Sequence, residues 1–225
     1  MAQATKIVVA SSFTAQTLAD YPGKLPAPIV VPYGFPAVGI EPERSRRGAV
    51  TQANPLRLLF VGGLSQRKGI ADLFTALNKL GPKVSLTVIG NKPAEDCPAL
   101  NQELARHRWI PSLPHERILE EMRAHDVFVF PSLFEGFGLV ITEAMSQGTP
   151  VVTTERTAGP DLITHGENGW LVKAGSTEAL GQQLEYIVEH PDAVYAAGVQ
   201  ARRTAAARPW TTYGHELAVA IRQPA

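Results

Sequence analysis

Two segments of this 225-residue chain combine glycines and charged residues in patterns that could bind a ligand. In the first, VGGLSQRKGI at 61–70, Gly62 and Gly63 precede Arg67 and Lys68, which stand just before an expected helix. Glycines let a ligand approach the backbone closely, and free N–H groups at a helix start attract anions. Arg and Lys add charge of the sign that suits a diphosphate. The segment therefore suggests a diphosphate site; the alternative is a surface turn with a solvated basic pair.

The second segment, FPSLFEGFGLVITEAMSQGTPVV at 130–152, contains two carboxylates, Glu135 and Glu143, eight residues apart. Helix positions at this spacing share roughly one face and lie about 12 Å apart along the axis, a span that the loop around Glu135 shortens or bends. Carboxylates so placed can hold hydroxyl groups at two ends of a polar ligand, such as the sugar and the ribose of a nucleotide sugar. The alternative is that they only complement a helix dipole, which suits Glu135 alone better than Glu143.

The residues between these carboxylates add backbone donors to the same segment. Gly136, Phe137 and Gly138 are expected to expose N–H groups at the start of a helix over 138–147, where a phosphate is favoured. The sequence contains neither the GxxxxGK(S/T) phosphate loop nor the GxGxxG dinucleotide fingerprint. The missing fingerprint disfavours an NAD-dependent oxidoreductase.

From residue 56 onward, short apolar runs alternate with stretches of helical spacing. The apolar runs predict strands over 56–63, 84–90, 109–110, 126–132, 150–154 and 168–172. The helical stretches predict helices over 70–80, 97–106, 115–125, 138–147, 177–190, 192–207 and 211–222. Strands that are apolar on both faces and alternate with helices form parallel sheets covered on both sides. We therefore predict a doubly wound, Rossmann-like α/β domain. The two charged segments follow its first and fourth strands, at the edge where open α/β sheets bind ligands.

The first 55 residues follow a different pattern. We expect a short strand over 5–10, a helix over 13–20 capped by Ser12, and a second apolar run over 28–34. Residues 35–55 are rich in Pro, Glu, Arg, Gly and Asn. This composition predicts a linker or an open loop, and it places a domain boundary there.

Composition excludes several classes of protein. Apolar residues make up 44% of the chain and charged residues 19%, as in ordinary globular proteins. Lys and Arg together number 21, as do Asp and Glu, so the net charge of zero disfavours a nucleic-acid partner. The single cysteine, Cys97, excludes a disulfide framework and a cysteine-based zinc site, and it favours a cytoplasmic compartment. No apolar run approaches the ~20 residues of a membrane span, and the N-terminus does not resemble a signal peptide.

The remaining candidate residues carry weaker signals. The histidines show no metal-ligand spacing, and we interpret four of them as surface or capping residues: His107, His115, His125 and His165. Ser132, at the end of the fourth strand, is either a phosphate contact or a serine that caps a turn. Neither interpretation of these residues adds a catalytic group to the two charged segments.

The chain contains the motifs VGGLSQRKG, FVFPSLFEGFGLVITEAMSQGTPVV and HGENGWLV. Together they resemble the C-terminal domain of a GT-B fold glycosyltransferase of family 4, also called group 1. The resemblance implies a retaining transfer of a sugar from a nucleoside-diphosphate sugar to a glycan, lipid or small-molecule acceptor. It implies that Glu135 meets hydroxyls of the donor sugar and that Glu143 meets the ribose. It also implies that Lys68, with Arg67 beside it, neutralises the diphosphate, with no metal or other cofactor.

The resemblance also implies a set of site residues. The expected catalytic residues are Glu135, Lys68 and Arg67. The expected donor-binding residues, in which Trp109 and Ile110 match the region that meets the nucleobase, are Gly62, Gly63, Arg67, Lys68, Trp109, Ile110, Glu135, Gly136, Phe137, Gly138, Leu139 and Glu143. One departure concerns Gly63, which stands where the family usually has an arginine. Either Arg67 supplies the missing charge or the phosphate is bound more weakly.

The resemblance divides the chain into three parts. Pro32, Tyr33 and Gly34 resemble the interdomain hinge of the family, and residues 6–18 resemble the last strand and helix before it. The expected parts are a remnant of an N-terminal domain with the linker (1–54), a nucleotide-sugar-binding domain (55–208) and a C-terminal helix that crosses back (209–225). The rest of the family's acceptor-binding domain has no counterpart in this sequence. We therefore expect residues 1–50 to be loosely packed or to pair with another chain.

Two alternatives to an active transferase stay open. A binding module would take the nucleotide sugar but transfer nothing by itself, as the missing acceptor domain suggests. A purely structural domain would bind no nucleotide. For a transferase we expect a partner, either a separate N-terminal acceptor domain or a second copy of this chain. We expect its location to be the cytoplasm, free or at the inner membrane surface.

Overall fold

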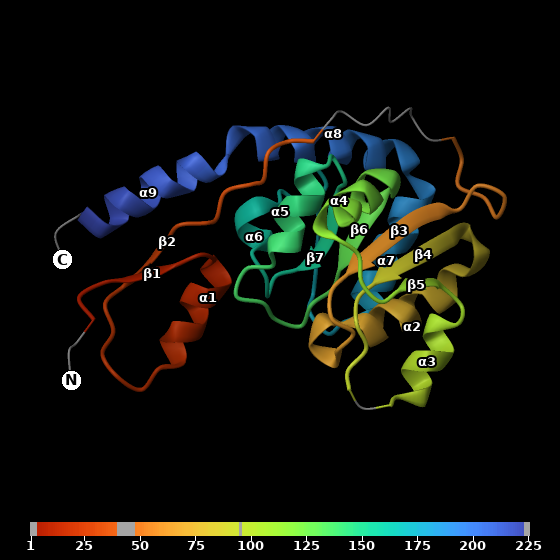
Figure 1. The fold of residues 1–225 in the computed structure, drawn as a ribbon, viewed down its shortest axis with the longest axis horizontal. Coiled ribbons are helices and arrows are strands. Elements are labelled where there is room, and N and C mark those ends of the chain that lie inside the picture. Colours follow the sequence, from red (N-terminus) through yellow and green to blue (C-terminus); the bar gives the residue numbers. More distant parts are fainter. Residues whose placement is uncertain (1–3, 40–47, 95, 223–225) are drawn as a thin grey trace.

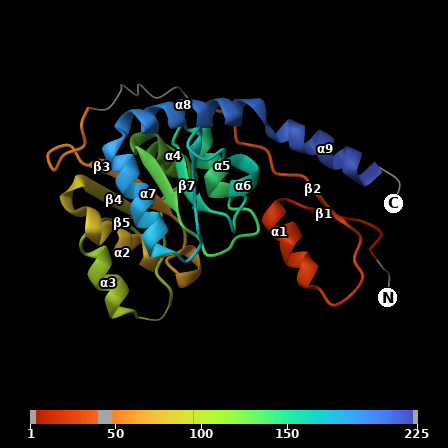
Figure 2. The same cartoon turned by 180° about the vertical axis from the view of Figure 1, so that it is seen from behind.

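The computed structural model describes residues 4–39, 48–94 and 96–222 (Figure 1). Part of the predicted linker, residues 40–47, lies outside the described residues. The described chain forms a larger part built on one sheet and a smaller part that lies beside it (Figures 1 and 2).

A sheet of six parallel strands lies at the centre of the larger part. From one edge to the other, the strands are β5 (Arg108–Ile110), β4 (Val84–Ile89), β3 (Leu56–Val61), β6 (Val127–Phe130), β7 (Val151–Thr154) and β8 (Gly169–Val172). Within this sheet the chain first forms β3 and then adds β4 and β5 on one side of it. It then crosses back to form β6 on the other side of β3, followed by β7 and β8. This order confirms the predicted doubly wound, Rossmann-like sheet, in which ligands bind where the direction of building reverses.

Helices cover both faces of this sheet (Figures 1 and 2). They are α2 (Ile70–Leu80), α3 (Pro98–Leu104), α4 (His115–Ala124), α5 (Leu139–Ser146), α6 (Gly159–Leu162), α7 (Thr177–Glu189) and α8 (Pro191–Ala207). Helix α2 packs against α7 on one face, and α5 packs against α4 and α8 on the other. In α2, buried Ile70, Leu73 and Leu77 follow the spacing of a single helix face, which explains why this helix was predictable.

Short elements account for most differences from the predicted pattern. Helix α6 and the 3-10 turn at Gln66–Lys68 were not predicted, because three or four residues show no measurable periodicity. Helix α5 begins at Leu139, one residue later than predicted. The reason is Gly138, whose φ of 90° is left-handed and therefore lies outside the helix.

The smaller part consists of the N-terminal arm, defined as residues 4–34, and helix α9 (Trp210–Arg222) (Figures 1 and 2). In the arm, β1 (Ile7–Val9) pairs in parallel with β2 (Pro28–Val30), and α1 (Ser12–Thr17) connects them. Helix α1 is shorter than the predicted helix, and it continues as a 3-10 turn over Leu18–Asp20. Its N-cap is Ser11 and not Ser12 as predicted, because the Ser11 side chain accepts the N–H of Thr14.

The expected loose packing of the first 50 residues is wrong where they touch the larger part. Ser11 is fully buried, Phe35 is 1% exposed, and Phe35 forms a bridge with Pro209. Lys6 of the arm donates hydrogen bonds to two carbonyl groups at the end of α9. The three-part division of the chain stays a prediction. Near its predicted boundary between residues 208 and 209, helix α8 ends at Ala207 and helix α9 begins at Trp210.

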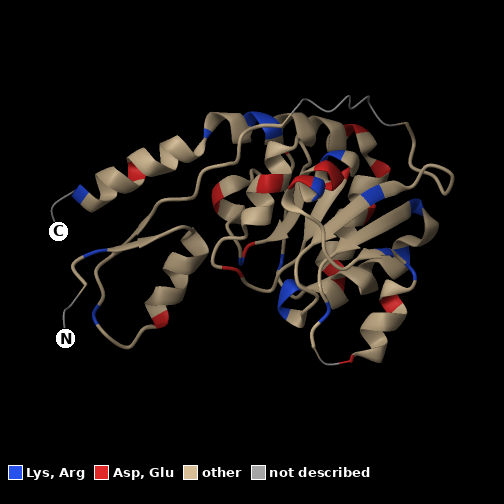
Figure 3. Ribbon diagram, in the orientation of Figure 1, with Lys and Arg blue, Asp and Glu red and all other residues tan. Residues whose placement is uncertain are grey.

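Charged side chains of both signs are mixed over the larger part, whereas α9 is mostly uncharged (Figure 3). This mixture matches the balanced composition of the chain. The predicted phosphate-binding cations, Arg67 and Lys68, therefore lie among side chains of both signs, and their local contacts decide what they can bind.

Candidate functional site

Strands β3 and β6 bring their following segments together at one edge of the sheet. Leu59 of β3 pairs with Phe128 of β6, so the two strands end side by side. After β3 the chain forms the 3-10 turn over Gln66–Lys68, which Gly69 closes with a left-handed φ of 67°. A Cβ atom on Gly69 would lie 2.0 Å from the carbonyl oxygen of Pro131. Glycine therefore allows this turn to pack directly against the end of β6.

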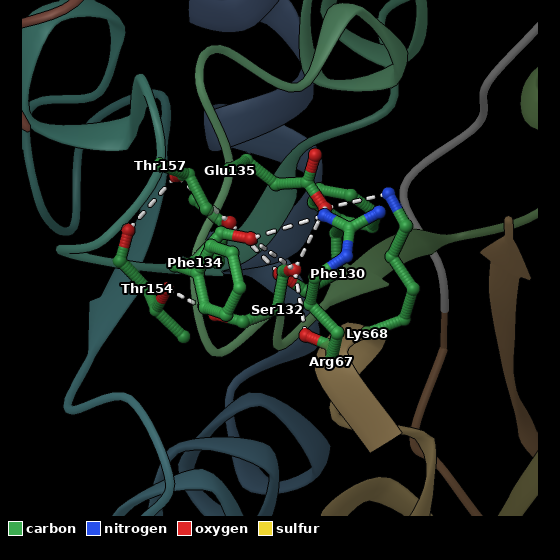
Figure 4. A network of polar contacts seen from close by, with 9 residues as sticks. Arg67, Lys68, Phe130, Ser132, Phe134, Glu135, Thr154 and Thr157 are labelled. Atoms are coloured by element: carbon green, nitrogen blue, oxygen red, sulfur yellow. Dashed lines mark hydrogen bonds and ion pairs between the residues drawn. The ribbon is translucent and has the colours of Figure 1, made fainter. Parts of the chain in front are cut away.

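The polar centre of this edge is the carboxylate of Glu135, in the loop after β6 (Figure 4). Its Oε1 accepts hydrogen bonds from Lys68 Nζ at 2.5 Å, from Arg67 at 2.6 Å and from the Ser132 hydroxyl at 2.9 Å. The side chains of Glu135 and Lys68 are 12% and 16% exposed, whereas that of Arg67 is 43% exposed. Lys68 Nζ also lies 5.0 Å from the centre of the Phe130 ring. Because shielded ion pairs interact more strongly than surface pairs, Lys68 contributes more than Arg67 to holding this carboxylate.

Ser132 orients Glu135 and does more than cap a turn. Its hydroxyl lies 2.9 Å from Glu135 Oε1, 3.0 Å from the carbonyl oxygen of Arg67 and 3.3 Å from that of Phe134. The side chain is fully buried, and the Ser132 carbonyl accepts a hydrogen bond from the Thr154 hydroxyl at 2.6 Å. This role was not predicted, although the position of the serine at the end of a strand was the signal available.

The loop from Glu135 to α5 contains the predicted backbone donors. Gly138 precedes α5 without a side-chain cap, so side chains leave the first N–H groups of the helix available. Phe137 is buried, whereas Leu139 is 45% exposed. Gly136 therefore links the carboxylate directly to the uncapped helix start, as the sequence predicted.

Gly62 and Gly63 connect β3 to the basic turn. The N–H of Gly62 donates to the carbonyl of Ile89 at 2.9 Å, which extends the pairing of β3 with β4 by one residue. A Cβ atom on Gly63 would meet nothing within 4 Å, and its φ is not left-handed. The described contacts therefore explain the course of the backbone here but do not require a glycine at Gly63.

Glu143 lies in α5 and is not part of the Glu135 cluster. Its side chain is 19% exposed, and its Oε1 lies 4.0 Å from Nδ1 of His115, at the start of α4. Burial raises the pKa of Glu143, and the nearby His115 opposes that shift only in part. The carboxylate accepts no hydrogen bond from the other described residues. It is therefore a half-buried acceptor that is available to a hydroxyl group.

Trp109 and Ile110 lie in β5, the edge strand, two strands away from β3. The indole N–H of Trp109 donates to the carbonyl of Gly90 at 3.0 Å, and Lys92 Nζ lies 4.3 Å from the centre of the ring. Both residues are half-buried and pack against the core. The structure does not bring them into contact with the Glu135 cluster, although β5 is parallel to β3 and β6 and its carboxyl end lies on the same side of the sheet as theirs.

A groove of about 800 Å³ lies at the amino ends of the strands, beside α4 and the first residues of β3 and β4. Its arginines already have acidic partners. Arg57 pairs with Asp126 at 2.7 Å, and Arg108 pairs with Glu121 at 2.7 Å. Each of these two arginines has a carboxylate of its own, whereas Lys68 and Arg67 share a single one. The groove therefore offers less unmatched charge to a ligand, and we do not consider it a functional site.

His125 is the C-cap residue of α4, which agrees with its interpretation as a capping residue. Its ring is buried, with Nε2 2.8 Å from the Thr87 hydroxyl and Nδ1 2.6 Å from the carbonyl oxygen of Glu121. Burial lowers the pKa of His125 and also that of His107, whose ring stacks on Phe74. Within residues 4–39, 48–94 and 96–222, no three His, Cys, Asp or Glu residues are grouped as metal ligands. No helix in these ranges has the length and apolar character of a membrane span.

Comparisons with known proteins agree with this architecture. The family described as "Glycosyl transferases group 1" matches residues 42–204. Alpha-maltose-1-phosphate synthase of Mycolicibacterium smegmatis is 34% identical in an alignment of 159 residues that covers 64% of this chain and 41% of that protein. Sucrose-phosphate synthase from Thermosynechococcus elongatus superimposes with a TM-score of 0.78 at 24% identity, over 98% of this chain and 58% of the other. HepE from Anabaena, in complex with UDP and glucose, gives a TM-score of 0.79 at 22% identity, over 97% and 63%.

The fold is that of the C-terminal domain of a GT-B protein. The match over residues 42–204 shows in addition that the chain belongs to the family of group 1 glycosyl transferases. It spans about two fifths of the length of the curated relative described above, 41%. The predicted resemblance is thus confirmed at the level of the family and the fold.

Proposed function

We propose that this chain is the donor-binding half of a retaining glycosyltransferase that uses a nucleoside-diphosphate sugar. The observation that carries the proposal is the pairing of Lys68 and Arg67 with Glu135 at the carboxyl edge of β3 and β6. Two cations, a carboxylate and an uncapped helix start lie within one short loop and one turn. These groups fit a ligand that carries both phosphate oxygens and sugar hydroxyls.

Donor binding requires an exchange of partners in this cluster. In the structure, Lys68 and Arg67 share the Glu135 carboxylate, whose single negative charge offsets only one of their two positive charges. The oxygens of a diphosphate would take over both cations, and the released Glu135 carboxylate would accept hydroxyl groups of the donor sugar. Glu143, half-buried and with an available carboxylate, is suited to the ribose hydroxyls. This arrangement assigns the two predicted carboxylates to opposite ends of the donor.

The same residues account for the chemistry that we propose. When the bond between the sugar and the diphosphate breaks, negative charge develops on the departing phosphate and positive charge on the sugar. Preorganised cations stabilise the first of these charges without moving, which is the usual source of rate enhancement. Lys68, held over Phe130 and 16% exposed, is the better placed cation. We assign this role to the two basic side chains and propose no metal ion.

One observation favours a second candidate function. All the groups that we assign to the donor lie between the end of β3 and helix α5. These residues could bind the nucleotide sugar without transferring it, and a separate N-terminal domain or a second copy would then complete the enzyme. The acceptor is a glycan, a lipid or a small molecule in either case.

Calorimetric titration tests both candidates. The chain is titrated with ADP, GDP, UDP and the glucose conjugate of each, and transfer is then assayed with and without a supplied N-terminal domain of a relative. We expect one nucleotide series to bind, and we expect Lys68→Ala and Glu143→Ala to weaken that binding. Transfer by the chain alone supports the enzyme, and transfer only with the added domain supports the binding module. Failure of every nucleotide to bind contradicts both.

A further inference from the structure

The loop that contains Glu135 is held along its backbone at three successive residues. The N–H of Glu135 donates to the carbonyl of Arg156 at 2.8 Å, and the carbonyl of Phe137 accepts the N–H of Ala158 at 2.9 Å. Both partners belong to the connection that follows β7. The residue between them, Gly136, is held from a different part of the molecule.

Two hydroxyl groups of the N-terminal arm bind the carbonyl oxygen of Gly136. The Ser11 hydroxyl lies 2.7 Å from this oxygen and the Thr14 hydroxyl lies 2.9 Å from it. A carbonyl oxygen has two lone pairs, so it can accept both. Ser11 is fully buried, and its Oγ also accepts the N–H of Thr14 as the cap of α1. The helix cap therefore fixes the position of the Ser11 oxygen, which also lies 2.9 Å from the Thr14 hydroxyl oxygen.

An aromatic contact from the arm reaches the next residue of the same loop. The ring of Tyr33 lies 4.7 Å from that of Phe137, centre to centre. Tyr33 in turn contacts Trp210 at 5.6 Å and Tyr213 at 5.1 Å, both in α9. The arm thus contacts Gly136 and Phe137 by two independent kinds of interaction.

We propose that Ser11 and Thr14 are positioning residues of the donor site, a proposal that rests on the proposed function. In a trans peptide, the carbonyl and the following N–H point in opposite directions. When the arm holds the carbonyl of Gly136, it also sets the direction of the Phe137 N–H, which donates to no other described residue. It further limits the movement of the preceding residue, Glu135. The arm therefore determines how the carboxylate and the loop amide are presented to the donor.

A purely structural role is the alternative to this proposal. The two hydroxyls would then only attach α1 to the larger part, as the contact of Ser12 with Asp161 does. Attachment predicts a loss of stability without a change in the loop. Positioning predicts a change at the peptide between Gly136 and Phe137, together with weaker donor binding.

The test uses Thr14→Val, which removes one hydroxyl from Gly136 and leaves the Ser11 cap intact. Thr17→Val is the matched control, because the Thr17 hydroxyl binds only within α1, at the carbonyl of Thr14. Labelling glycine carbonyls with ¹³C and phenylalanine amides with ¹⁵N reports on two peptides in this sequence, Gly34–Phe35 and Gly136–Phe137. The first of these peptides serves as an internal reference. Affinity for ADP, GDP, UDP and their glucose conjugates is measured on the same samples.

We expect Thr14→Val to shift the signal of the Gly136–Phe137 peptide and to weaken binding of the glucose conjugate about threefold to tenfold, the effect of one ordinary hydrogen bond. Ser11→Ala should do the same, and Ser11→Thr should restore it. A signal that stays unchanged, or equal affinities for Thr14→Val and Thr17→Val, overturns the positioning role. If the unmodified chain binds none of the nucleotides, the proposed function itself is wrong and the positioning role fails with it.

Discussion

Glu135 and Glu143 lie eight residues apart on one loop and helix, but their surroundings are opposite. Both side chains are largely buried, at 12% and 19% exposure. Glu135 accepts hydrogen bonds from two cations and a buried serine, whereas the described residues place near Glu143 only an exposed histidine, 4.0 Å away. The first carboxylate therefore competes with any anion for its cations. The second is buried with only partial compensation from His115, which is why its pKa is raised.

The largest expected effect concerns Lys68, which pairs with Glu135 and does not contact Glu143 among the described residues. Lys68→Ala should weaken binding of a nucleoside diphosphate about tenfold to a hundredfold, because a hydrogen bond to a charged group contributes about 1.5–3 kcal/mol. Calorimetry with the nucleotide that the unmodified chain binds checks this. Lys79→Ala is the matched control, since it removes the same charge from the last turn of α2. Equal losses in the two variants would reduce the effect to net charge and remove the distinction.

Exchanging each carboxylate for an amide should change nucleotide affinity in opposite directions. Glu135→Gln keeps the size of the side chain but releases the two cations, so UDP, GDP or ADP without a sugar should bind as tightly or up to about tenfold more tightly. The preference for the sugar conjugate over the free diphosphate should fall at the same time. Glu143→Gln should instead weaken both ligands about threefold, because it replaces a charged acceptor of hydroxyl groups.

Glu185→Gln, in an exposed position of α7, controls for the loss of one negative charge. Changes of the same sign in Glu135→Gln and Glu143→Gln would contradict the comparison. The two carboxylates would then contact the ligand in the same way, and the exchange of partners at Glu135 would not occur.

The sequence predicted the strands and helices around the two carboxylates better than it predicted the contacts that the carboxylates make. Helix α2 was predictable because its burial imposes a helical period, and β3 was predictable because burial on both faces gives a continuous apolar run. The sequence placed the segments of Lys68 and Glu135 after the first and fourth strands, at the same edge of the sheet. It did not predict their ion pair, which depends on Gly69 packing against Pro131 in a turn too short to show a period.

Contacts between distant segments were the least predictable. Ser11 and Gly136 are 125 residues apart, and nothing in either local sequence indicates that they meet. The burial of His125 was missed for a similar reason, since Thr87 supplies a buried hydroxyl from another strand. In each case a polar partner compensates burial that the residue type alone would not favour.

The raised pKa of Glu143 predicts how stability depends on pH. The folded state binds its proton more tightly than the unfolded state, so folding is favoured at low pH. That advantage is lost as the pH rises from the ordinary value of 4.5 through the raised folded pKa. Glu143→Gln cannot ionise, so it should gain stability relative to the unmodified protein over this window. Urea unfolding at several pH values measures the difference. A difference that does not change with pH would mean that burial does not disfavour this charge.

The smallest expected effect concerns His115, the only ionisable neighbour that the described residues place near the Glu143 carboxylate. Its side chain is 61% exposed, and pairs of this kind contribute about 0–1 kcal/mol. When it is protonated, the imidazole attracts the carboxylate and competes with a ribose hydroxyl. His115→Gln should therefore raise nucleotide affinity by less than about fivefold, and more at low pH than at high pH.

Titration at several pH values, with His215→Gln on α9 as the control, measures this effect. The result decides whether Glu143 is an acceptor that only waits for the ligand or one that His115 already occupies in part. An affinity gain that persists at high pH would arise from the shape of the side chain and not from its charge. A loss of affinity would mean that His115 itself contacts the nucleotide, and Glu143 would then be one half of a pair, as Glu135 is with Lys68.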